Sequence, residues 1–107
     1  MIQVVYYRTY NRLTMEGHAH SGTPGHDLVC AGASAMAYTL AANVGNMETN
    51  GQVRDVTVVL EPGKAEISCR AKSKYTAIVE RIFAAVCVGF EMLAASNPQY
   101  ISYEIRG

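Results

Sequence analysis

The 107-residue chain lacks several features that would assign it to a common class of protein. It has no tryptophan, three prolines and three cysteines, and no two cysteines form a CxxC pair. An odd number of widely spaced cysteines argues against a disulfide framework, so we expect reduced thiols and a cytoplasmic location. No dinucleotide-binding glycine motif and no phosphate loop occurs, and we expect no cofactor and no resident metal.

An excess of charge is also missing, because nine basic and nine acidic residues cancel. A chain without a basic excess offers no electrostatic basis for tight nucleic-acid binding. No apolar run approaches the ~20 residues of a membrane helix, and the N-terminus lacks the pattern of a signal peptide. We therefore expect neither a nucleic-acid partner nor a membrane.

The first third of the chain predicts a β-hairpin followed by a helix. Residues 2–7 are rich in strand-forming side chains, and residues 12–18 alternate between apolar and polar. On this alternation His18 ends the second strand on the polar side of the sheet. A loop over residues 19–26 follows, in which Gly22 and Gly25 would act as hinges. Asp27 is the predicted N-cap of a helix over residues 28–47, which has apolar residues at spacings of three and four.

The rest of the chain predicts a second hairpin, a second helix and a last strand. Val53–Leu60 and residues 65–69 flank a Glu61-Pro62-Gly63-Lys64 turn. Ser73 is the predicted cap of a helix that ends before Asn97-Pro98, and residues 100–105 alternate again. The predicted fold is α+β with the order ββαββαβ, in which two helices pack on an antiparallel or mixed sheet. Residues 1–107 would form a single domain.

His18 and Cys30 flank the predicted loop and form the candidate reactive pair. At neutral pH a free cysteine is only a few per cent thiolate. At the start of a helix, the macrodipole would favour the anion by about 0.3–1 kcal/mol, which is too little alone. A protonated imidazole beside the thiol would supply the remainder. Free N–H groups at the helix start, including that of Cys30, would stabilise an oxyanion.

Two polar neighbours of Cys30 have a structural and a functional interpretation. Asp27 is either only a helix cap or a third catalytic member that orients the imidazole. Ser34 lies four residues after Cys30 on the same helix face. It either packs closely in the helix or supports the thiolate.

A metal site is the main alternative to a nucleophile. His18, His20, His26, Asp27 and Cys30 are all of ligand type, but their spacings match no common zinc site. A cluster of this kind can also be purely structural. Cys69 and Cys87 lie in apolar contexts and are predicted to be core residues.

The motif residues closely resemble the signature of the Prp family, the ribosomal-processing cysteine proteases. The similarity lies in Gly17-His18-Ala19, in Gly25 through Ala31 with Asp27 and Cys30, and in Ser34. Element order extends the resemblance over the whole chain. His20 and His26 receive no catalytic role, and Thr23-Pro24 would stiffen the loop.

The resemblance implies that Cys30 is the nucleophile and His18 the general acid and base, with Asp27 at the position of the family's aspartate. It also implies a homodimer with a mobile loop between histidine and cysteine. The implied reaction removes the N-terminal extension of a bacterial large-subunit ribosomal protein, number twenty-seven, after a pair of aromatic residues. A non-catalytic ribosome-associated protein that only binds this extension, or a zinc-binding module, remains the alternative.

Overall fold

The computed structural model describes the backbone of residues 1–18 and 24–107 and the side chains of residues 1–18 and 28–107. The predicted order ββαββαβ is confirmed, with a short 3-10 helix before β2 and another before α2. The elements are β1 (Ile2–Tyr7), η1 (Arg8–Tyr10), β2 (Arg12–Glu16), α1 (Pro24–Thr49), β3 (Val53–Glu61), β4 (Lys64–Ala71), η2 (Ser73–Tyr75), α2 (Thr76–Ser96) and β5 (Ile101–Arg106).

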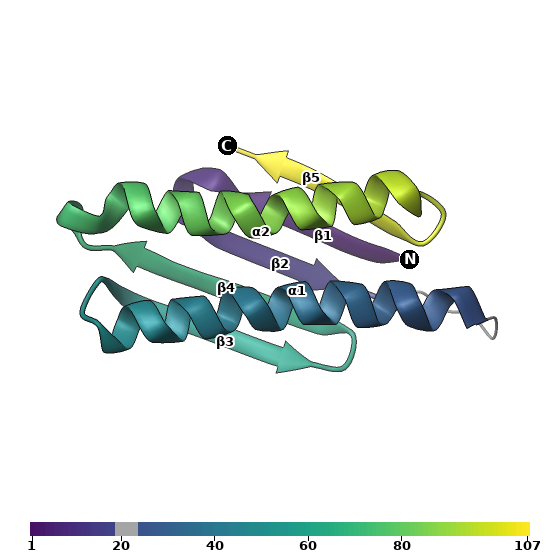
Figure 1. The fold of residues 1–107 in the computed structure, drawn as a ribbon, viewed down its shortest axis with the longest axis horizontal. Helices are drawn as coiled ribbons and strands as arrows, with labels where there is room; N and C mark the ends of the chain where they lie inside the picture. Colours follow the sequence, from purple (N-terminus) through teal and green to yellow (C-terminus); the bar gives the residue numbers. More distant parts are fainter. Residues whose placement is uncertain (19–23) are drawn as a thin grey trace.

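The five strands form one mixed sheet in the order β3-β4-β2-β1-β5. β1 and β5 are parallel, and the other neighbours are antiparallel. Figure 1 shows α1 running along the β3–β4 side of the sheet and α2 along the β1 side. Glu16 of β2 pairs with Lys64 of β4, so the β3–β4 turn lies beside the end of β2. This register brings residues 61–63 to the place where the chain leaves β2 toward α1.

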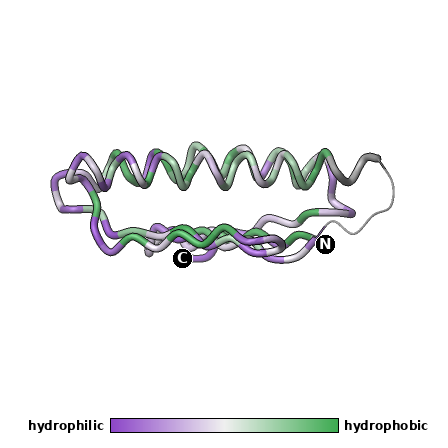
Figure 2. Tube along the Cα trace, turned by 90° about the horizontal axis from the view of Figure 1, so that it is seen from below, coloured by the Kyte–Doolittle hydropathy of each residue, from purple (hydrophilic) through white to green (hydrophobic). Residues whose placement is uncertain are grey.

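The molecule has two layers, because both helices cover the same face of the sheet (Figure 2). Alternate residues of each strand point into the space between the layers, as the period-two pattern predicts. In β4, for example, Ala65, Ile67 and Cys69 are buried while the residues between them are not. The largest fully buried side chains are Phe83, Phe90, Leu13, Leu40, Ile67, Ile101, Val4, Val44 and Val79.

The helix α1 begins earlier than the sequence pattern suggested. It starts at Pro24, a residue suited to the first helical position because its missing N–H needs no partner there. Asp27 is therefore inside the helix, and the prediction that it is the N-cap is wrong. Gly25 is also helical rather than a loop hinge, whereas Gly22 lies outside the described residues.

Two further sequence expectations need correction. Ser73 does not cap α2: it begins η2, and α2 starts at Thr76 with no side-chain cap. The segment Leu28–Thr49 of α1 is, by length and composition, apolar enough to cross a membrane, so the expectation that no run approaches such a length was too strict. Core helices pass the same test, and Ala33, Leu40 and Val44 of this helix are fully buried in the core.

Candidate active site

A cavity of about 200 Å³ opens at the end of the sheet where β2 leads toward α1. Three predicted site residues, His18, Cys30 and Ser34, line it together although twelve to sixteen positions separate the first from the others. The complete lining is Ile2, Met15, Gly17, His18, Cys30, Ser34, Tyr38, Leu60, Glu61, Pro62 and Gly63. The side chain of Asp27, the fourth predicted site residue, lies outside the described part of the chain.

Cys30 is half-buried and packs against the core from the second turn of α1. Only the first four N–H groups of a helix lack an intrahelical partner, and the macrodipole acts mainly within the first turn. Because α1 starts at Pro24, the expectation that Cys30 lies in the first turn with a free N–H is wrong. Activation of the thiol therefore depends still more on the neighbouring imidazole.

His18 lies on the helix side of the sheet, not on the polar side that the alternation predicted. It shares the cavity with Ile2 and Met15, which pack in or against the core. The reason is that β2 ends at Glu16 and Gly17 takes a left-handed backbone with φ +104°. A side chain at Gly17 would also collide with the carbonyl of Met1. Both the left-handed backbone and this close approach therefore require glycine here.

The imidazole of His18 rests against Gly63 in the β3–β4 turn. A Cβ atom at Gly63 would lie 2.7 Å from Cε1 of His18 and closer still to Nε2, well inside van der Waals contact. The backbone on both sides of the imidazole is also held: Gly17 N–H donates to the Gly63 carbonyl at 2.9 Å, and the Met1 nitrogen donates to the His18 carbonyl at 2.9 Å. The turn thus fixes the place of the candidate catalytic base.

Four residues of the cavity were missed by sequence reasoning: Gly63, which contacts His18, and Tyr38, Leu60 and Glu61. Tyr38 of α1 and Leu60 of β3 are 58% and 40% exposed and form an apolar rim. Glu61, the last residue of β3, brings a carboxylate to the same cavity. Tyr38 follows Ser34 by one helical turn and could have been found from that spacing, whereas Leu60 and Glu61 arrive through the β2–β4 register.

The other two cysteines behave as the predicted core residues. Cys69 is 2% exposed and Cys87 is 3% exposed. Burial raises the pKa of each thiol from 9.0 to about 11, so both are protonated at neutral pH. Among the side chains that the structure describes, no group of three histidine, cysteine, aspartate or glutamate residues could hold a metal. The side chains of His20, His26 and Asp27 are not among them.

The shifted thiols predict that folding stability falls above pH 9. In the unfolded chain the thiols ionise near 9.0, but in the folded chain only near 11. Unfolding therefore releases protons between these values, and the free energy of unfolding should decrease as the pH rises through this range. Urea denaturation at several pH values measures this decrease in the free energy of unfolding. A Cys69→Ala variant should show a shallower decrease, and an equal slope in both proteins would contradict the assignment.

Comparison with known proteins gives one family and several structural neighbours. The family described as cysteine protease Prp matches residues 1–102. A crystal structure of an essential ribosomal processing protease Prp from S. aureus, with a covalently linked product peptide, superposes with a TM-score of 0.73 and 23% identity. That match covers 99% of this chain and 100% of the other.

Two further solved structures share the fold. The same S. aureus protease with a substrate peptide has a TM-score of 0.69 and 19% identity, covering 98% of this chain and 97% of that one. SMU.848 from Streptococcus mutans has a TM-score of 0.69 and 22% identity, covering 98% and 93%. No curated protein matches the chain significantly.

Proposed function

We propose that this chain, which belongs to the Prp family of cysteine proteases, cuts peptide bonds with Cys30 as nucleophile and His18 as general acid and base. The observation that carries the proposal is the shared cavity: a thiol from α1 and an imidazole from the end of β2 meet in one opening at the protein surface. A nucleophile and a base that open into one cavity are the minimum that thiol-dependent acyl transfer needs.

The reaction has two steps. The Cys30 sulfur attacks the peptide carbonyl while the imidazolium of His18 gives its proton to the leaving amine, which leaves an acyl thioester on Cys30. A water molecule then loses a proton to His18 and attacks the thioester, which releases the carboxylic acid product and restores the thiol. Ser34 lines the same cavity one turn after Cys30, and we expect it to donate a hydrogen bond to the thiolate.

The proposed substrate is the precursor of large-subunit ribosomal protein number twenty-seven, from which the enzyme would remove the N-terminal extension. The S. aureus neighbours are ribosomal processing proteases bound to product and substrate peptides, which supports a peptide substrate of this kind. The apolar rim of Tyr38 and Leu60 suits the aromatic residues expected before the cut. At about 200 Å³ the cavity is smaller than a typical site for a drug-sized ligand, which favours insertion of a single side chain.

Incubation with the precursor ribosomal protein tests the proposal. Mass spectrometry should show loss of the extension after an aromatic pair. A second precursor, in which alanines replace that pair, is the control and should remain intact. Binding of the extension without any cleavage would instead support a non-catalytic peptide-binding protein, and cleavage elsewhere would refute this substrate assignment.

Asp27 is the family's motif aspartate, and we expect it to orient His18. Since it is not the N-cap of α1, its exchange should leave the helix intact. Asp27→Asn is predicted to lower kcat at least about tenfold, because an amide cannot stabilise the imidazolium. Glu61→Gln, which changes the carboxylate that lines the cavity, is the matched comparison and should retain most activity. A larger loss of kcat in Glu61→Gln than in Asp27→Asn would indicate that Glu61, not Asp27, orients His18.

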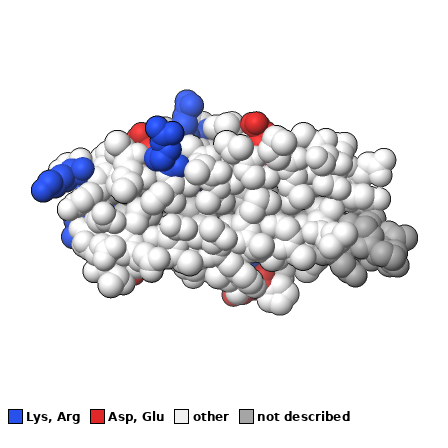
Figure 3. Space-filling model, in the orientation of Figure 1, with Lys and Arg blue, Asp and Glu red and all other residues white. Residues whose placement is uncertain are grey.

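We further propose a homodimer in the cytoplasm. Few charged side chains cover the helical face of the molecule (Figure 3), and Tyr38, Ile78 and Met92 expose apolar area from the two helices. Three unpaired cysteines suit a reducing compartment. Light scattering after gel filtration should give twice the mass of one chain, and the mass of a monomer at micromolar concentration would contradict the dimer.

A further inference from the structure

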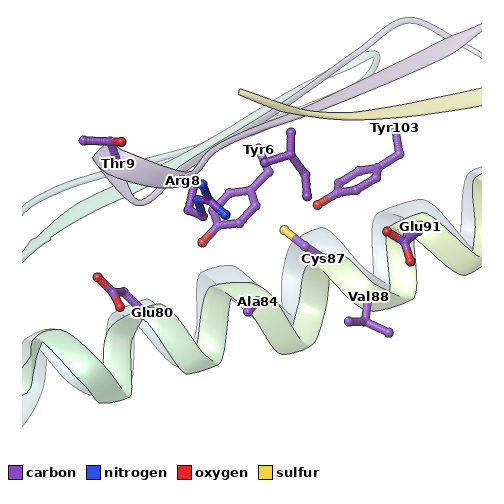
Figure 4. A pocket seen from close by; sticks show the side chains of 10 residues that line it. Tyr6, Arg8, Thr9, Glu80, Ala84, Cys87, Val88, Glu91 and Tyr103 are labelled. Carbon is purple, nitrogen blue, oxygen red and sulfur yellow. The ribbon is translucent and has the colours of Figure 1, made fainter. Parts of the chain in front are cut away.

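A second and larger cavity lies away from His18 and Cys30, between α2 and the strands β1 and β5 (Figure 4). Its volume of about 630 Å³ is within the range of small-molecule sites, roughly 300–1,000 Å³. It exists because α2 does not cover the end of β5: Ile105, which continues the cavity floor, is 51% exposed. No residue of this cavity lines the His18–Cys30 cavity.

Much of the floor and wall of this cavity is an apolar surface. Tyr6 pairs with Ile105 and Val4 with Tyr103 in the parallel β1–β5 register, so the two tyrosines lie two pairs apart, on the same face of the sheet. Ala84 and Val88 of α2 line the same cavity. A flat or aliphatic ligand body would contact rings on one side and a helix on the other.

The Tyr6 hydroxyl is a polar group held in a fixed position at this cavity. Tyr6 is 3% exposed and its ring stacks on Phe83, with centroids 6.1 Å apart, so the side chain cannot turn outward. Figure 4 shows its hydroxyl pointing into the cavity. Within the described residues it has no hydrogen-bond partner, whereas the neighbouring Tyr103 hydroxyl pairs with the Cys87 thiol. The buried polar atoms without a partner in the described part of the chain belong to Asn11 and Arg12, so the Tyr6 oxygen is open to the cavity and available to a ligand atom.

The charged side chains around the cavity indicate the sign of the charge that a ligand should carry. Glu80, Glu91 and Arg8 line it, and the ion pairs seen in the described residues all lie elsewhere, at Arg12–Glu66, Arg70–Asp55 and Arg106–Glu104. Burial is the main cause that raises the pKa of Tyr6; Glu80 also raises this pKa and Arg8 lowers it. Arg8 and Glu80 therefore both lie near Tyr6 and oppose each other there. Glu91 stands alone at the Tyr103 end, so that end of the cavity is negative.

We propose that this cavity is a second binding site, for a small organic cation: a primary ammonium or guanidinium on an apolar, preferably aromatic, body. The cationic group would lie between Glu91 and the face of Tyr103, where ion pairing and cation–π attraction add. The body would cover Ala84 and Val88, and a polar atom at its far end would reach the Tyr6 hydroxyl. The site is independent of the peptidase proposal, because none of its residues takes part in the cleavage reaction.

An NMR titration of the full chain with 2-phenylethylamine tests the site. Amide shifts should be confined to the cavity, around Ala84, Val88 and Tyr103. The neutral analogue 2-phenylethanol should bind about fivefold more weakly, since it lacks the charge that the exposed Glu91 attracts. Cys30→Ala should bind the amine like the wild type, so a failure of the peptidase proposal leaves this test intact.

Two variants make the test specific. Glu91→Gln should weaken amine binding and leave alcohol binding unchanged, whereas Glu48→Gln, at an exposed position of α1, should change neither. Equal affinity for amine and alcohol, or an unchanged amine affinity in Glu91→Gln, would overturn the proposal. So would cavity shifts that follow protein concentration instead of the amine, because a second copy of the chain would then be the occupant.

Discussion

Cys30→Ala is expected to lower the rate of peptide cleavage at least about a thousandfold, to the level of a protein without a nucleophile. No other cysteine can replace it, since Cys69 and Cys87 are buried and protonated at neutral pH. The fold should persist, because alanine is the best helix former and Cys30 is only half-buried. Rates with a peptide spanning the extension junction, together with thermal unfolding, measure both parts.

Cys69→Ala is the matched control for this loss. It removes a fully buried thiol from β4, so it should reduce stability by about 1 kcal/mol and leave kcat unchanged. If Cys30→Ala cleaved at the wild-type rate, Cys30 would not be the nucleophile. If Cys69→Ala lost activity as fully as Cys30→Ala, the effect would be structural instead of chemical.

Gly63→Ala is expected to lower kcat by about a hundredfold through displacement of His18. The new methyl group would occupy the position against which the imidazole rests. A displacement of about 1 Å in a catalytic group can reduce the rate to this extent. The measurement is kcat well below the unfolding temperature, with the ring-proton NMR signals of His18 as a direct report on its surroundings.

Gly51→Ala separates this steric effect from backbone strain. Gly51 has φ +72° and Gly63 has φ +77°, so alanine suffers a similar penalty of about 1–2 kcal/mol at either site. In the described part of the chain, nothing besides its two chain neighbours lies within 4 Å of the added methyl group at Gly51. Gly51→Ala should therefore be destabilised yet fully active. Equal activity of the two variants, or unchanged His18 signals in Gly63→Ala, would contradict the role of Gly63.

Local patterns in the sequence were sufficient to predict most of the fold. Alternation in β4 and the apolar stripe of α2 predicted their buried faces, because side-chain burial follows the period of each element. The start of α1 was missed. Gly25 and Asp27 are residues typical of turns and caps, but the helix extends to Pro24, whose fixed φ suits a first helical position.

The candidate site was predictable only as far as its residues come from neighbouring segments. His18 and Cys30 flank one loop, so their approach followed from the hairpin and the helix. Gly63 and Glu61 belong to a turn more than forty residues later, and the pairing of Glu16 with Lys64 brings them to His18. That pairing depends on which strands are neighbours in the sheet, and the local pattern of β2 or β4 does not specify its neighbour.

Acid-quenched mass spectrometry during turnover tests most directly whether Cys30 carries the reaction. The enzyme is mixed with the junction peptide, stopped in acid within the first turnover, and digested. We expect the fragment containing Cys30 to gain the mass of the acyl part of the substrate, and His18→Ala to accumulate far less of this adduct. Peptide cleavage without any adduct on Cys30 would contradict the account.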